Sequence, residues 1–326
     1  MPQINETIYA PSFDGGEWIQ QGPIDLKQLR GKAVVLVDFW DYTCVNCIRT
    51  LPYVVEWHRR YARFGLQVVG VHAPEFSFAR DHANVLAAIK QFGLEYPVVV
   101  DNGYNIWRAY SNRFWPAKYL VDAQGRLRYY HFGEGLYQET ETQIQRALTE
   151  LNPAVDLPPP IEPLRESDRP GALCYRVTPE LYLGYARGQF GNPAGVTRDR
   201  ATDYTDPGRH AEGATYLSGR WNVGQESAIA EAPGAAIAIR YTAMDVNLVL
   251  APPAGKTARL EIYLSDGQRL GDDAKISDGR PIVTVDRARM YSLVANESVM
   301  TGSLKIAALD AGVSAYAFTF ISCVVS

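Results

Sequence analysis

Runs of apolar residues separated by polar turns predict alternating strands and helices in the first 151 residues. The run Val34–Val37 predicts a buried strand, and Ile48, Leu51 and Val55 follow it at helical spacing. The later elements predicted in this way are strands at Leu66–Val71 and Pro97–Val100, helices at 81–92, Ile106–Tyr110 and Glu139–Leu151, and a hairpin of Lys118–Ala123 with Leu127–His131. Right-handed crossovers between these strands would place helices on both faces of an α/β sheet.

The stretch before this core is predicted to form a short hairpin. Trp18-Ile19 and Ile24–Leu26 are its apolar arms, and Gly22-Pro23 supplies the turn. The hairpin would lead into the first long apolar strand.

Residues 152–171 are predicted to connect two domains. Five prolines fall between Pro153 and Pro163, and the charged stretch Arg165–Arg169 follows them. This composition is typical of a semi-rigid, extended spacer. The predicted domains are therefore residues 1–151 and 172–326.

Beyond residue 171 the helical period largely disappears and apolar residues alternate with polar ones. The alternating sets are Val246/Leu248/Leu250, Leu260/Ile262/Leu264, Ile282/Val283/Val285 and Tyr316/Phe318/Phe320. Turn signals such as Ser265–Gly267 separate these runs. Several short strands at such spacing predict an all-β antiparallel sandwich or jelly roll.

The composition and net charge of the chain indicate which kinds of binding partner are not expected. The 326 residues are 47% hydrophobic and 21% charged, with a net charge of −4. Because no long Lys/Arg run is present, nucleic acid and anionic membrane surfaces are not expected partners. No apolar stretch reaches the roughly 20 residues that span a bilayer. The segment Met1–Glu6 lacks the basic and apolar regions of a signal peptide, which is expected of a cytoplasmic protein or of a piece of a longer protein that is exported or membrane-anchored.

The chemistry predicted from the sequence centres on Cys44 and Cys47. The pair lies where the strand after Val34 gives way to the first turn of a helix. Free N–H groups and the positive end of the helix dipole favour a thiolate there. A thiolate attacks disulfides, and a second cysteine one turn later can close the ring and release the product. The pair therefore predicts a dithiol–disulfide oxidoreductase in which Cys44 attacks and Cys47 resolves.

Three neighbouring features fit this chemistry. Asp38 lies on the apolar strand, where a buried carboxylate could exchange a proton with Cys47. Pro52 removes one backbone donor from the following helix. Trp115-Pro116 precedes a predicted strand, where an X-Pro bond can be cis and its backbone could pair with an extended substrate.

Four motifs resemble those of one known family. They are the segments 39–53 (FWDYTCVNCIRTLPY), 70–76 (GVHAPEF), 115–122 (WPAKYLVD) and 131–135 (HFGEG). They are similar to the soluble C-terminal part of DipZ-type proteins, relatives of TlpA-like and DsbD-like membrane thiol reductants. In the second half, the segments 179–185, 245–252 and 315–320 resemble the carbohydrate-binding-module-like domain of the same proteins. The resemblance covers nearly the whole chain.

The resemblance implies a thioredoxin-like fold with an inserted helix–strand, followed by the β-sandwich. It implies a substrate-binding surface at Trp40, Thr43, Asn46, Trp115 and Pro116, protein disulfides as substrates, and a DsbD/CcdA-like membrane electron carrier as reductant. It also favours a location outside the cytoplasm. No organic cofactor and no metal are expected, because the cysteines carry the electrons.

This chain departs from thioredoxin in its active-site motif. Thr43 replaces a tryptophan, and Val45-Asn46 replaces Gly-Pro between the cysteines. Since that dipeptide tunes the redox potential, reductant, oxidant and isomerase all remain open.

Aromatic residues gather early in the second domain. They include Tyr182, Tyr185, Tyr204, Tyr216 and Trp221. Exposed rings would let the domain bind a glycan by stacking, whereas buried rings would belong to the sandwich core. A docking or scaffold role is the other interpretation, since fold alone does not fix function.

Three other interpretations of the sequence are a zinc site, a peroxidase and a non-enzymatic binding module. A zinc site would need two further ligands, and Cys174 and Cys323 are far away in sequence and expected to be small buried residues or idle thiols. A peroxiredoxin-like peroxidase would need the pattern P-x-x-x-T-x-x-C, whose proline is missing here. A non-enzymatic module that binds a glycan or a protein partner is the remaining alternative.

Overall fold

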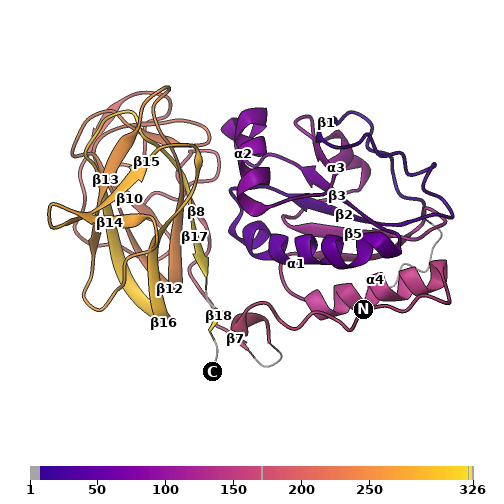
Figure 1. Ribbon diagram of the computed structural model, residues 1–326. Coiled ribbons are helices and arrows are strands. Elements are labelled where there is room, and N and C mark those ends of the chain that lie inside the picture. The colour runs from indigo at the N-terminus through magenta and orange to yellow at the C-terminus, as the bar shows by residue number, and fades with distance from the viewer. Residues whose placement is uncertain (1–7, 170–171, 322, 325–326) are drawn as a thin grey trace. The chain divides into compact units, whose positions relative to one another are not determined.

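The computed structural model describes residues 8–169, 172–321 and 323–324. The chain forms two compact units, residues 1–168 and 169–326; the colour gradient of Figure 1 follows the chain through both. The boundary falls between Asp168 and Arg169, within the charged stretch, so most of the segment predicted as a spacer is part of the first unit.

The first unit is built on a six-stranded sheet with the strand order β1-β4-β3-β2-β5-β6. The strands are β1 (Glu17–Gln20), β2 (Val34–Trp40), β3 (Leu66–His72), β4 (Val98–Val100), β5 (Ala117–Val121) and β6 (Leu127–Phe132). Strands β2, β3 and β4 are parallel to one another, whereas β1, β5 and β6 each pair antiparallel with their neighbours. The predicted thioredoxin-like sheet and its β5–β6 hairpin are confirmed.

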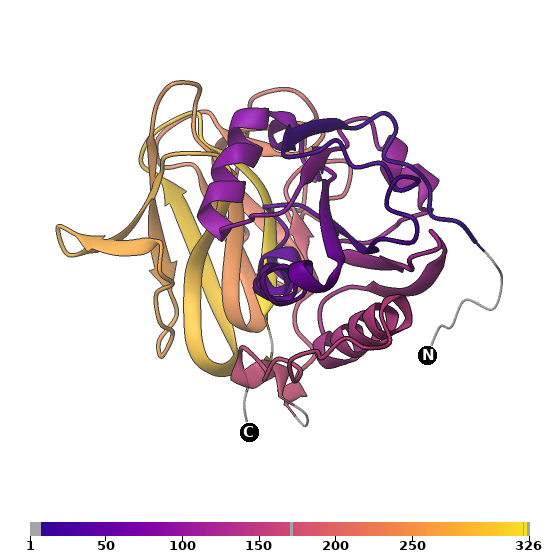
Figure 2. The same cartoon turned by 45° about the vertical axis from the view of Figure 1, so that its right-hand side comes forward.

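Helices cover both faces of this sheet. The described part of the first unit contains α1 (Val45–Tyr61), α2 (His82–Phe92), α3 (Asn105–Ala109) and α4 (Tyr137–Leu151), with short 3-10 turns η1 (Ala62–Phe64), η2 (Ser77–Arg80) and η3 (Glu166–Asp168). Alternate residues of β2 face two cores. Leu36 packs with residues of α1, α2 and α4, whereas Val37 packs with residues of α3. Helix α1 lies along the first of these faces (Figure 1 and Figure 2).

The predicted N-terminal hairpin is wrong. Strand β1 pairs with β4, with Glu17 opposite Val100 and Trp18 opposite Val99, and residues 24–26 form no strand. The side chain of Gln20 adds hydrogen bonds to the Leu94 and Tyr96 carbonyls. Strand β4 would otherwise have an open edge with unpaired backbone groups, and β1 supplies their hydrogen-bond partners. A local hairpin of residues 18–26 would leave that edge of β4 unpaired.

The proline-rich segment packs against α1 and α4. Ile161 is buried, and its N–H donates to the buried carboxylate of Glu141 at 2.9 Å. The hydroxyl of Tyr53 in α1 donates to Asp168 at 2.8 Å and accepts the Leu164 N–H at 2.7 Å. Through these contacts residues 161–168 form a strap that is bonded to α1 and α4, whereas the sequence predicted a semi-rigid, extended spacer.

The second unit is all-β, as predicted. Its main sheet comprises β8 (Leu181–Tyr182), β9 (Thr202–Tyr204), β10 (Thr215–Val223), β11 (Ala228–Ala230), β12 (Ala236–Ala251), β13 (Ala258–Leu264), β14 (Ala274–Ser277), β15 (Arg280–Val285), β16 (Arg289–Ala308) and β17 (Ser314–Ile321). A separate ladder joins β7 (Leu173–Cys174) to β18 (Cys323–Val324). All pairings between these strands are antiparallel.

The long strand β12 closes the main sheet around one core. Its first half pairs with β10 and its second half with β17, while β11 joins β10 to β17. Register shifts after Ala243 and Val246 mark bulges, which let a strand bend from one layer to the other. Alternate residues of β12, including Ile239 and Leu248, point into the core.

Candidate active site

The two cysteines lie at the start of α1, directly after the buried strand β2. Cys44 is the N-cap residue, and its Sγ accepts the Cys47 N–H at 3.3 Å. Both residues are thiols in this structure. The Cys44 sulfur thus accepts one of the N–H groups that the first turn of a helix leaves unpaired. The cysteines therefore lie, as predicted, where the strand gives way to the helix.

The two thiols differ in their environment. Cys44 is 9% exposed, whereas Cys47 is fully buried. Burial raises the pKa of the Cys47 thiol well above its usual value, and its hydrogen bond with Cys44 and the charge of Cys44 raise it further. A nucleophile must be reachable, so this asymmetry fits Cys44 as the attacking thiol and Cys47 as the resolving one.

We therefore expect alkylation to distinguish the cysteines. Iodoacetamide added to the reduced protein near neutral pH should modify Cys44 first, because Cys47 is buried and protonated. Peptide mass spectrometry over a time course measures the order, and urea-unfolded protein serves as the control in which both should react alike. Faster labelling of Cys47 in the folded protein would reverse the assignment.

Asp38 lies on β2 and is fully buried. Neither of its carboxylate oxygens has a hydrogen-bond partner among the residues that the structure describes. Burial raises its pKa from 3.8 to about 7, although the positive charge of Lys118 opposes the rise. Its negative charge also contributes to the raised pKa of Cys47. A carboxyl group that titrates near neutral pH beside a buried thiol is suited to take that thiol's proton.

The residues predicted to bind substrate lie in different settings. Asn46 is half-buried in the first turn of α1, whereas Thr43 and Trp40 are buried. The Trp115 indole donates to the Ala73 carbonyl at 3.0 Å, and the Trp115-Pro116 peptide is cis. Trp115 also packs against the hydrophobic cluster that contains both cysteines. Trp40 is inside the core and is not placed to touch a substrate.

One residue that shapes the site was not identified from the sequence. The buried carboxylate of Asp41 accepts the Thr43 N–H and hydroxyl, each at 2.6 Å, and the Glu75 N–H at 2.7 Å. It thereby fixes the turn before Cys44 and ties that turn to the loop after β3. The sequence pattern that could have identified Asp41 is Asp-x-Thr, because an aspartate side chain often accepts the backbone N–H two residues later.

Lys118 is the second such residue. It is fully buried, and its neighbour in the register of strands β2 and β5 is Asp38. His72, also buried, is held neutral because burial lowers its pKa to about 3. The lysine stands in one of the family-like segments, but its burial depends on strand pairing that local sequence does not specify.

The five aromatic residues predicted to bind a ligand in the second unit are buried or are in contact with other side chains or the backbone. Tyr216 and Trp221 are buried. Arginine guanidinium groups lie over two of the other rings, Arg187 at 3.7 Å from the centre of the Tyr182 ring and Arg198 at 4.9 Å from that of Tyr185. The remaining one, Tyr204, accepts the Thr197 N–H at 3.0 Å. These five residues therefore do not form one open stacking platform.

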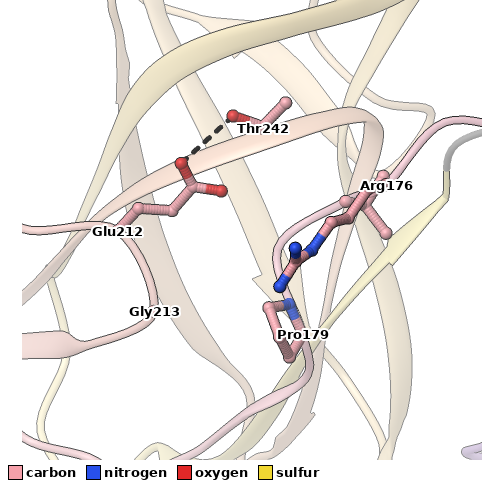
Figure 3. A pocket seen from close by; sticks show the side chains of 6 residues that line it. Arg176, Pro179, Glu212, Gly213 and Thr242 are labelled. Carbon is pink, nitrogen blue, oxygen red and sulfur yellow. Dashed lines mark hydrogen bonds between the residues drawn. The ribbon is translucent and has the colours of Figure 1, made fainter.

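The second unit also contains a cavity of about 420 Å³ (Figure 3). It is lined by Arg176, Val177, Pro179, Glu212, Gly213 and Thr242. The Glu212 carboxylate accepts hydroxyl hydrogen bonds from Thr178 at 2.5 Å and Thr242 at 3.2 Å. Because the lining includes no aromatic ring, this cavity lacks the stacking surface on which the predicted glycan site depended.

Within the described residues, no group of three or more His, Cys, Asp or Glu side chains is placed to hold a metal ion. No helix in that part of the chain is long and apolar enough to cross a membrane. The side chains of Cys174 and Cys323 lie outside what the structure describes, so the expectation for these residues stays a prediction.

Two family models match the chain, one in each half. The AhpC/TSA family matches residues 9–130, and a thioredoxin-like C-terminal domain family matches residues 178–320. The second match lies within the all-β unit.

Several known proteins are similar to the chain. Protein DipZ of Mycobacterium bovis is 36% identical over 322 residues, which are 98% of this chain and 44% of DipZ. The thiol-disulfide oxidoreductase ResA of Bacillus thuringiensis is 31% identical over 144 residues, which are 44% of this chain and 77% of ResA. A solution structure of an oxidised thioredoxin-like protein aligns with 45% of this chain and 99% of its own, at 27% identity and a TM-score of 0.42. The resemblance to DipZ-type proteins is thus confirmed, although the chain spans less than half the length of DipZ.

Proposed function

The chain belongs to the thioredoxin-like thiol–disulfide oxidoreductases, and from this premise we propose that its Cys44–Cys47 pair exchanges a disulfide with protein substrates. The observation that carries the proposal is the placement of a slightly exposed thiol at a helix N-terminus, with a fully buried thiol one turn on and a buried carboxyl group near that second thiol. Each of these groups has one task in the exchange.

In the first step the Cys44 thiolate attacks one sulfur of a substrate disulfide. The substrate S–S bond breaks, a mixed disulfide with Cys44 forms, and one substrate thiolate leaves. Cys47 then gives its proton to the Asp38 carboxylate and attacks Cys44 Sγ. The Cys44–Cys47 disulfide forms and the second substrate thiolate leaves, so two electrons pass from the pair to the substrate. The reverse sequence oxidises a dithiol.

Substrate docking at the loop before β5 is part of the proposal. Trp115 packs against the cluster that contains the cysteines, and Asn46 is half-buried beside them. An extended polypeptide could pair with the backbone of Trp115 and Pro116 as an added strand. The second unit would then serve for docking a partner.

We also propose that the cysteine pair needs no organic cofactor or metal and is recharged by a membrane thiol carrier outside the cytoplasm. Support for the carrier comes from the identity with DipZ over nearly the whole chain. Vesicles that hold a reduced membrane thiol carrier of the DsbD/CcdA kind should replace dithiothreitol in sustaining turnover. Failure of every such carrier to reduce the pair would argue against this route.

The AhpC/TSA match favours one alternative, a peroxidase. Its required P-x-x-x-T-x-x-C pattern is missing around both cysteines. Insulin reduction with dithiothreitol as electron source and peroxide consumption under the same conditions distinguish the two activities. We expect insulin reduction that depends on Cys44 and Cys47 and survives serine substitution of both Cys174 and Cys323. Peroxide consumption without insulin reduction would replace the proposal by the alternative, and a glycan array tests a binding role for the second unit.

A further inference from the structure

A lysine is buried on the strand beside the one that leads to the cysteine pair. Lys118, which follows the first residue of β5, is fully buried, which is rare for a lysine unless opposite charge accompanies it. Its Nζ donates to the Gly133 carbonyl at 3.2 Å. The proposed exchange mechanism gives this lysine no task so far.

Strand register shows which groups surround it. Lys118 is opposite Asp38 of β2 on one side and opposite His131 of β6 on the other. Paired residues on adjacent strands project from the same face of a sheet. Leu36 and Leu120, two positions away on the same strands, belong to the cluster that contains Cys47. Asp38, Lys118 and His131 therefore form a row on the face that α1 covers.

One cation in this row faces two acids. Burial lowers the pKa of Lys118 below its usual value, and the negative charges of Asp38 and Cys47 oppose this lowering. Burial also penalises the charged forms of Asp38 and Cys47. His131 adds no second cation near neutral pH, since burial and the charge of Lys118 lower its pKa. The other titratable groups around the row are Tyr96, Glu134 and Glu139.

We propose that Lys118 is a positioning residue for the resolving step, whose ammonium group balances one negative charge shared between Asp38 and Cys47. The proposal rests on the exchange mechanism above. The proton moves from Cys47 Sγ to the Asp38 carboxylate, so the three groups carry the same total charge before and after. The Cys47 thiolate then attacks Cys44 Sγ, and the bond from Cys44 to the substrate sulfur breaks. The ammonium group acts through its charge, since neither oxygen of Asp38 is hydrogen-bonded to it. Without it, the shared negative charge would be buried in this row with no cation to balance it.

The segment that follows β6 holds Lys118 in place. Gly133 accepts from the Lys118 ammonium, and its own N–H donates to the Pro116 carbonyl at 2.8 Å. Glu134 then bonds the Arg49 guanidinium of α1 at 2.7 Å. The family-like segment His131–Gly135 thus links the lysine both to the loop before β5 and to the helix that carries the cysteines.

The reagent 5,5′-dithiobis(2-nitrobenzoate) separates the two chemical steps. Attack by Cys44 releases one thionitrobenzoate, and resolution by Cys47 releases a second, so stopped-flow absorbance gives each rate. In Lys118→Met the second phase should slow about tenfold or more at pH 7, because one pKa unit changes the thiolate fraction tenfold. Its pH midpoint should rise, since the cation that lowers the pKa of Asp38 is gone. The exposed Lys90→Met in α2 is the matched control and should behave as the wild type.

Charge and size are separated by a second variant. Lys118→Arg keeps the positive charge and should retain most of the wild-type rate and pH midpoint, also if the methionine variant fails to fold. A wild-type second phase in folded Lys118→Met, or an arginine variant as slow and as shifted in pH as the methionine one, would overturn the role of charge. Release of a single thionitrobenzoate by the wild type would instead overturn the exchange mechanism, and the role of Lys118 with it.

Discussion

Replacing Cys47 by Ala should convert the protein into a trap for its substrates. Cys44 keeps its place at the N-terminus of α1 and still attacks, but no thiol remains to resolve the mixed disulfide. Turnover in insulin reduction should be lost, and covalent adducts should accumulate on Cys44. Non-reducing gels and mass spectrometry of the adducts measure this outcome.

The matched control is Cys44→Ala. This variant should lose turnover as well, yet form no adducts, because Cys47 is fully buried. Adducts on Cys47 in this control, or none on Cys44 in the Cys47→Ala protein, would contradict the order of attack and resolution.

Asp38→Asn should slow the resolving step and remove a pH dependence of stability. The amide cannot take the proton of Cys47, and a positioned proton acceptor contributes about 10²–10⁴-fold, so a loss of about a hundredfold at pH 7 is expected in the second thionitrobenzoate phase. The first phase should change little, since the Cys44 thiolate attacks without this proton transfer. An unchanged second phase across pH 6–9 would reduce Asp38 to a buried structural group.

The sign of the stability effect follows from the raised pKa of Asp38, about 7 in the folded protein against an ordinary 3.8. Between these two values the folded protein holds more protons than the unfolded chain, so its stability falls as the pH rises through this window. The full penalty, on the order of 4 kcal/mol, is reached above the folded-state pKa. Asp38→Asn should therefore gain stability over the wild type between about pH 4 and 8.

Urea unfolding at several pH values measures this gain, with the exposed Asp156→Asn as a control that should show none. A wild type that becomes more stable from pH 4 to 8, relative to Asp38→Asn, would contradict the raised pKa. Asp38, the proposed proton acceptor, thus lowers the free energy of unfolding at neutral pH while it assists the resolving step.

Local sequence patterns were sufficient to predict where the two cysteines lie in the fold. The apolar run at Val34–Val37 and the helical spacing after Cys47 place both cysteines where β2 meets α1, as the structure has them. Both signals lie within about 20 residues of each other, so short-range periodicity determines them.

Contacts distant in sequence were not predictable in this way. Strand β1 pairs with β4, about 80 residues later, although a nearby turn suggested a hairpin. Lys118 lies beside Asp38 only because β5 pairs with β2. The strap at residues 161–168 has the composition of a spacer, yet its polar groups are bonded by Tyr53 and Glu141. In each case a partner far along the chain decides the structure.

The second unit shows the same limit for side chains. Alternation of apolar and polar residues predicted an antiparallel β structure, but it did not show which aromatic rings would be free. Trp221 faces the core of β10 and its neighbours, and Arg187 lies over Tyr182. Cross-strand packing and side-chain rotamers decide exposure, and a one-dimensional pattern contains neither.

A redox titration of the Cys44–Cys47 couple tests the central claim most directly. The protein is equilibrated in dithiothreitol or glutathione buffers of graded potential, quenched with acid, and the peptide that contains both cysteines is analysed by mass spectrometry. We expect one reversible two-electron transition, with a tenfold change in the ratio of the two forms per about 30 mV, and no such transition in Cys44→Ala or Cys47→Ala. Persistence of both thiols in the most oxidising buffer would contradict the account.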